Sequence, residues 1–100
     1  MTYESIDPII DGWSREHSLR IVPEFGGVPR RFCYVSGGID ESFQISIEPP
    51  AGEAVVVKAW SVETRDDQEF HEQWTASAAT LRSTLEEALA TISKWKERDA

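Results

Sequence analysis

The last quarter of the chain carries the clearest pattern of hydrophobic positions. Between residues 77 and 98 the apolar side chains recur every three or four positions, at Leu81, Leu85, Ala88, Leu89, Ile92 and Trp95. This spacing predicts a helix of about five turns with one apolar face, at ~3.6 residues per turn. Ser77 or a neighbour would cap it, and its polar face, with Arg82, Glu86 and Glu87, should be solvated. The apolar face needs a surface to pack against.

A second, shorter helix is predicted near the start of the chain, over residues 5–18. Its apolar face would carry Ile6, Ile9, Ile10, Trp13 and His17. Asp7 followed by Pro8 would open it, because Asp is a good N-cap and Pro suits the first helical position.

Between these helices the hydrophobic period changes from three or four to two. Phe43, Ile45 and Ile47 alternate with polar residues, which is typical of a strand with one buried face. The other predicted strands cover residues 19–25, 30–36 and 54–64. Residues 69–75 fit either a fifth strand or a short helix, and we favour the strand.

Turn residues separate these runs every ten to twelve positions, which favours antiparallel hairpins over parallel crossovers. The sequence therefore predicts a single α+β domain over residues 1–100 with two layers. An N-terminal helix would precede an antiparallel meander of four to five strands, and a long C-terminal helix would follow it. Each helix has one apolar face, so both should pack on the same face of the sheet.

The charge balance narrows the choice of partners. Eighteen acidic residues against ten basic ones give a net charge of −8. This charge repels phosphate backbones and anionic lipid, so we expect neither nucleic acid nor a membrane as partner. A basic protein partner, or solubility alone, would explain it.

Cellular location and redox chemistry follow from two further observations. The first ten residues lack the basic start and apolar run of a signal peptide, and no apolar run approaches ~20 residues. Cys33 is the single cysteine, so no intramolecular disulfide can form. We expect a cytoplasmic protein, with Cys33 as an inert core residue.

Few residues suggest catalysis or cofactor binding. Gly26-Gly27 and Gly37-Gly38 lie between strands and do not open a helix, so they predict tight turns, not a phosphate-binding loop. His17 has no partner that can be read from the sequence, so a role at the edge of the core is favoured over a general base. We expect no cofactor and no catalytic residue set.

The segment around His71 is the best candidate for metal chemistry. His71-Glu72 begins like the zinc-protease pattern HExxH, but Thr75 stands where the second histidine would be. The possible ligands of a metal ion here are Asp66, Asp67, Glu69, His71 and Glu72. The alternative, which we favour, is an acidic and solvated hairpin tip.

The four tryptophans divide into two groups. Trp13 and Trp95 fall on the apolar faces of the helices and should be buried. Trp60, Trp74 or Tyr34 could instead lie on the face of the sheet that the helices leave open. Exposed aromatic side chains there would form a patch of the kind that marks protein contacts.

The order helix, meander, helix is similar in topology to the double-stranded-RNA-binding fold, but the acidic chain lacks the basic helix terminus that this function needs. In size and charge the chain resembles bacterial secretion chaperones and toxin-neutralising immunity proteins, a broad group of small acidic α+β domains. That resemblance implies a protein partner that is neutralised or escorted.

The leading hypothesis is thus a non-enzymatic protein-binding module for a basic protein. Its expected contact residues are Glu63, Asp66, Asp67, Glu69, Glu72, Trp60 and Trp74. Two alternatives stay open: a small metal- or histidine-dependent enzyme that uses His71 and nearby carboxylates, and a structural homodimer that pairs through the open sheet face.

Overall fold

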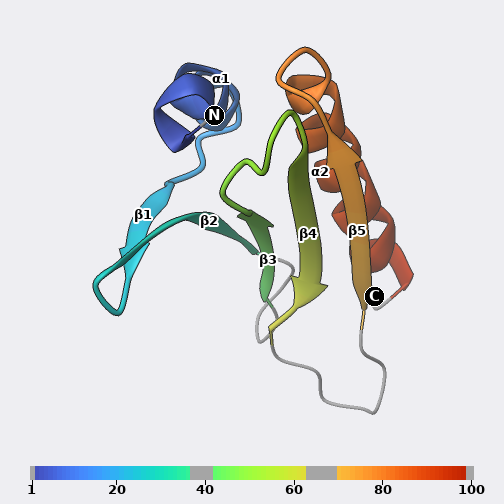
Figure 1. The fold of residues 1–100 in the computed structure, drawn as a ribbon. Helices are drawn as coiled ribbons and strands as arrows, with labels where there is room; N and C mark the ends of the chain where they lie inside the picture. Colours follow the sequence, from blue (N-terminus) through green and yellow to red (C-terminus); the bar gives the residue numbers. More distant parts are fainter. Residues whose placement is uncertain (1, 37–41, 63–69, 99–100) are drawn as a thin grey trace.

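The computed structural model describes residues 2–36, 42–62 and 70–98 (Figure 1). Two helices flank five strands in the chain. They are α1 (Tyr3–Glu16), β1 (Val22–Phe25), β2 (Val28–Ser36), β3 (Ser42–Ile47), β4 (Val55–Ser61), β5 (His71–Ala76) and α2 (Leu81–Arg98). The predicted α+β order is confirmed.

The strands form one antiparallel sheet in which spatial order follows chain order, β1-β2-β3-β4-β5. Each strand pairs only with its neighbours along the chain, as in a meander. The choice of a strand for residues 69–75 is confirmed for the part from His71 onwards, which pairs with β4. The predicted turn at Gly37-Gly38 lies outside the described residues.

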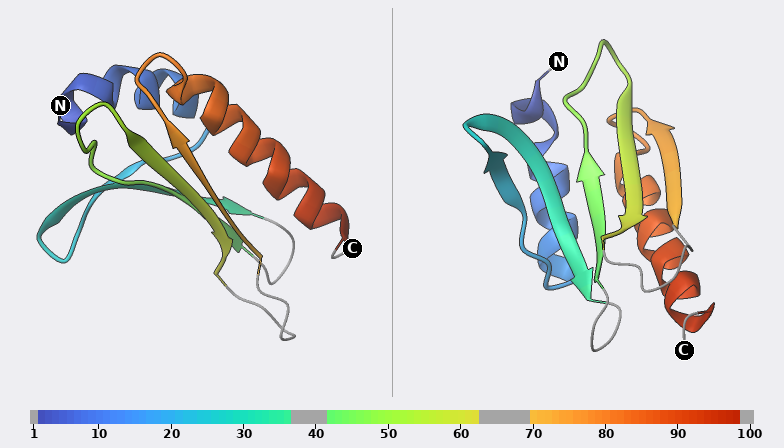
Figure 2. Two further views of the ribbon diagram at one scale, coloured as in Figure 1. Left: turned by 45° about the vertical axis from the view of Figure 1, so that its right-hand side comes forward. Right: turned by 90° about the horizontal axis from the view of Figure 1, so that it is seen from below.

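Both helices pack on one face of this sheet, as predicted, and Figure 2 shows the two layers. The side chains of the sheet that face the helices are almost fully buried. They include Cys33, Val35, Phe43, Ile45, Ile47, Val55, Val57 and Ala59. Ile6, Ile10 and Trp13 of α1, and Leu81, Leu85, Ala88, Ile92 and Trp95 of α2, complete one common core. The apolar side chains that recur every three or four residues in the helices pack here against those that alternate along the strands.

The start of α1 differs from the prediction. The helix begins at Tyr3, after Thr2 in an extended conformation, so Asp7 is not its N-cap and Pro8 lies inside it. Asp7 does not cap the helix because its carboxylate binds a charged side chain more strongly than it would bind backbone N–H groups. Arg31 of β2 donates two hydrogen bonds to it, from Nε at 2.7 Å and from Nη2 at 3.0 Å. A charged pair of this geometry holds the carboxylate on the sheet side of the helix.

The end of α1 is sharply defined. Ser18 has a positive φ of 55°. Its N–H donates to the carbonyl of Arg15 at 3.2 Å, and the N–H of Leu19 donates to the carbonyl of Ser14 at 2.8 Å. These are the two hydrogen bonds of a Schellman motif, with Ser18 where glycine is usual. The motif fixes the positions of Glu16 and His17 at the end of the helix.

The long C-terminal helix begins at Leu81, four residues later than the predicted start at residue 77. Ser77 and Thr80 form a turn before it that has the two reciprocal hydrogen bonds of a capping box: the Thr80 N–H donates to Ser77 Oγ at 3.3 Å, and the Ser77 N–H donates to Thr80 Oγ1 at 2.9 Å. The predicted capping role of Ser77 is therefore confirmed, with the turn of residues 78–80 between it and Leu81. Among the described residues, neither helix is long and apolar enough to cross a membrane.

Candidate functional site

The face of the sheet opposite the helices is open. Alternation along the strands places Phe32 and Tyr34 of β2 on this face, and the pairing adds Gln44 of β3, Trp60 of β4 and His71 of β5. Tyr34 is 54% exposed, whereas Trp60 is half-buried. In both views of Figure 2 the two helices lie on the opposite side of the sheet.

The apolar part of this face extends onto the tip of the β1–β2 hairpin, which projects away from the rest of the sheet (Figure 1). Phe25 and Val28 pair with each other there and are 70% and 56% exposed. Between them Gly26 and Gly27 have φ values of 61° and 79°, as a tight two-residue turn requires. The prediction that this glycine pair serves as a turn is therefore confirmed.

Three aromatic rings connect the tip to the sheet. The ring of Phe25 lies 6.4 Å from that of Phe32, and the ring of Phe32 lies 5.9 Å from that of Tyr34, both edge to face. Phe32 is almost fully buried between its neighbours, so it supports the two exposed rings. We call Phe25, Val28, Phe32 and Tyr34 the aromatic ridge. Phe25 and Val28 were not among the predicted contact residues, although two apolar residues that flank Gly-Gly favour side chains on the same face of a hairpin.

The charges on the open face are few among the described residues. Lys58 pairs with Glu48 at 2.7 Å, and Arg30 is exposed on the same face as the ridge. Within the described parts of the chain, the ridge itself is a neutral, apolar surface.

The predicted contact residues are divided by the structure. Trp60 lies on the open face, but Trp74 pairs with Val57 and packs against the core on the helix-covered face. The prediction that Trp74 could be on the open face is wrong, because the register of β5 sets its side. Glu72 is exposed and pairs with Ala59, on that same helix-covered side. Glu63, Asp66, Asp67 and Glu69 lie outside the described residues.

His71 is exposed at the start of the edge strand β5, opposite Trp60. Its neighbour Glu72 points to the other face of the sheet, so these two side chains do not converge. The remaining carboxylates of the predicted metal site lie outside the described residues.

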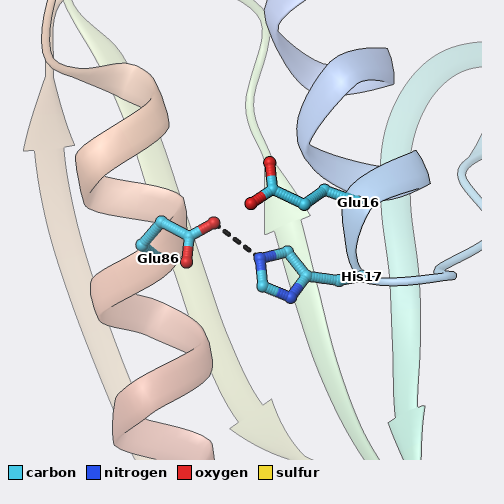
Figure 3. A group of neighbouring side chains, drawn as sticks. All are labelled: Glu16, His17 and Glu86. Atoms are coloured by element: carbon cyan, nitrogen blue, oxygen red, sulfur yellow. Dashed lines mark hydrogen bonds and ion pairs between the residues drawn. The ribbon is translucent and has the colours of Figure 1, made fainter.

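A different histidine has carboxylate neighbours. Glu16 and His17, at the end of α1, meet Glu86 of α2, as Figure 3 shows. His17 Nε2 lies 2.6 Å from Glu86 Oε1, and Arg82 of α2 pairs with Glu16. The prediction that Arg82 and Glu86 are merely solvated is wrong, since both contact α1. The sequence holds no signal for this cluster, because 69 residues separate His17 from Glu86.

Cys33 is buried and 1% exposed. Burial raises the pKa of its thiol to about 12, despite a hydrogen bond with the backbone of Ile45 that acts in the opposite direction. A thiol in this state is a poor nucleophile, which agrees with its predicted place in the core.

Comparison with known proteins adds no relative: no protein-family model, no curated protein and no solved structure matches the chain.

Proposed function

We propose that the protein is a non-enzymatic protein-binding module that docks a partner on its open sheet face and the aromatic ridge. One observation carries the proposal. The three most exposed large hydrophobic side chains of the described residues, Phe25, Val28 and Tyr34, all lie on this face, at 70%, 56% and 54% exposure.

Exposed rings of this kind are costly to leave in water. Each aromatic side chain can bury ~150–250 Å² on contact, and aromatic residues are enriched at the centres of protein interfaces. Phe25 and Tyr34 are also held by Phe32 from beneath, so they lose little side-chain freedom on binding.

The net charge of −8 favours a basic partner. In this proposal the ridge supplies the contact, while the excess of negative charge, to which Glu72 and the acidic residues of the 63–69 sequence contribute, attracts the partner over longer distances. Neutralising or escorting a basic protein is the concrete form of this function.

The test is a comparison of three forms of the protein in affinity capture, followed by titration of the purified partner. The forms are the natural chain, the double variant Phe25→Ser/Tyr34→Ser, and the control Ala90→Ser on the exposed side of α2. We expect the control to bind like the natural chain and the double variant to bind at least ~10-fold more weakly. Raising the salt concentration should slow association.

Equal binding by the double variant and the natural chain would contradict a role for the ridge. Light scattering over a dilution series covers the homodimer alternative. The homodimer alternative predicts that the mass of the natural chain doubles as its concentration rises, while the double variant stays a monomer. That result would identify the occupant of this face as a second copy of the chain and overturn the proposal of a basic partner.

A further inference from the structure

We propose that Glu16, His17 and Glu86 form a binding site for a divalent transition-metal ion of the zinc type, which would link the end of α1 to α2 (Figure 3). This site is separate from the aromatic ridge and does not depend on the function proposed above.

The donor atoms are of the right kind and close enough together. Each of the three residues offers one ligand atom, and these atoms lie within 4.8 Å of one another. One imidazole nitrogen and two carboxylate oxygens suit Zn²⁺, which commonly takes three protein ligands and leaves a further position for water. Mg²⁺ prefers oxygen ligands only, so the imidazole selects against it.

The fold brings these donors together before any ion binds, and the ion has to open the 2.6 Å contact between His17 Nε2 and Glu86 Oε1. The Schellman motif at Ser18 fixes the backbone of Glu16 and His17. The ring of Trp13, which is fully buried, lies 6.1 Å from the imidazole of His17 and limits its rotation. Since α1 and α2 share one buried core, Glu86 is presented to His17 by packing that the metal does not have to create.

The site is also accessible. The side chains of His17, Glu86 and Glu16 are 32%, 44% and 58% exposed. An ion can therefore reach the donors from solvent without opening the core, and water can complete its coordination.

Arg82 is the competitor of the metal ion. It pairs with Glu16. Its guanidinium also lies close to Gly12 of α1: a Cβ atom placed on Gly12 would be 3.5 Å from Nη1 of Arg82. A bound cation must displace this positive charge from Glu16. Replacing Arg82 with a neutral residue should therefore raise the affinity for the metal ion, whereas replacing one of the three metal-binding side chains should lower it.

The opposite effects expected of these variants give a sharp experiment, in which the folded protein is titrated with ZnCl₂ in a calorimeter at about pH 8, because protons compete with a metal ion for its ligands. Removing a residue that only hydrogen-bonds to a metal ligand already lowers metal affinity by ~10–100-fold. We therefore expect His17→Ala and Glu86→Gln to weaken Zn²⁺ binding by at least ~10-fold. Arg82→Gln should tighten it by about three- to tenfold.

Two controls separate this site from other sources of binding. His71→Ala removes the other histidine and should leave the affinity unchanged. MgCl₂ in place of ZnCl₂ should give no saturable binding. Added Zn²⁺ should also raise the melting temperature of the natural chain, because a ligand that binds only the folded state stabilises it, and His17→Ala should abolish this rise.

Three results would overturn the proposal: no saturable binding by the natural chain, Zn²⁺ affinity that His17→Ala leaves unchanged, or affinity that depends on His71. The double variant Phe25→Ser/Tyr34→Ser should bind Zn²⁺ normally, so failure of the ridge and failure of the metal site can be distinguished.

Discussion

Arg31 and Asp7 form a bidentate ion pair that links α1 to the sheet. The two hydrogen bonds measure 2.7 and 3.0 Å, and the same guanidinium lies 4.4 Å above the ring of Tyr3. Tyr3 in turn donates a hydrogen bond of 2.7 Å from its hydroxyl to the carbonyl of Ile47. The beginning of α1 is thus connected to both β2 and β3 by polar contacts at the edge of the core.

Replacing Arg31 with alanine should lower the free energy of unfolding by about 2 kcal/mol, because Asp7 would lose both charged hydrogen bonds in a partly buried setting. Arg31→Lys should retain less than half of the stabilisation that Arg31 provides, since lysine cannot form the bidentate contact. Urea denaturation measures both. The control is the exposed neighbour Arg30→Ala, which should change stability by less than about 0.5 kcal/mol. Equal effects of the two alanine variants would show that the ion pair contributes nothing.

Replacing Ser18 with glycine should stabilise the protein. Ser18 has a φ of 55°, where an L residue is strained and glycine is not. After allowance for the greater freedom of glycine in the unfolded chain, we expect a gain of about 0.5–1 kcal/mol. For a domain of this size that gain raises the melting temperature by about 2–6 °C. Ser5→Gly, within α1, should lower it. A lower melting temperature for Ser18→Gly would mean that its side chain matters more than its backbone.

Cys33 should resist thiol reagents in the native protein. Because burial raises its pKa to about 12 from an ordinary 9.0, almost no thiolate exists near pH 8. Labelling with an aromatic disulfide should follow the rate of unfolding and become fast only in denaturant. Fast labelling of the folded protein would contradict the buried position.

The same shift has a consequence at alkaline pH. The folded-state pKa lies above the unfolded value, so the contribution of Cys33 to stability is complete below about pH 9 and falls as the pH rises towards about 12. Cys33→Ala should lack this component of the loss, which parallel denaturation curves over that range would reveal.

Replacing Leu85 with alanine should cost about 2–5 kcal/mol, as for other truncations in a packed core. Leu85 is fully buried in the middle of the layer between α2 and the sheet. Glu87→Ala, on the exposed side of the same helix, should be close to neutral. Thermal unfolding followed by circular dichroism tests both. An unchanged melting temperature for Leu85→Ala would mean that α2 is not the cover of the sheet.

The sequence predicted the layers better than the ends of the elements. Burial at Ile45, Ile47 and Leu85 follows from local periodicity, which depends only on neighbouring residues. The Asp7 carboxylate could not be placed in the same way. As an isolated signal it favours an N-cap, and only the arrival of Arg31 from β2 overrides that preference.

The candidate sites show the same division. The glycine turn at the hairpin tip was predicted, and the exposure of Phe25 and Val28 follows from the pairing of β1 with β2. By contrast, the meeting of His17 with Glu86 depends on how two helices cross a sheet, which no local pattern records.

The placement of α1 has a consequence for the order of folding. Its polar partners are far along the chain, with separations of 24 residues to Arg31, 44 to Ile47 and 69 to Glu86. The strands, in contrast, pair only with their immediate successors, which costs little loop-closure entropy. During synthesis, α1 leaves the ribosome before α2, so it cannot complete its contacts until α2 has followed it.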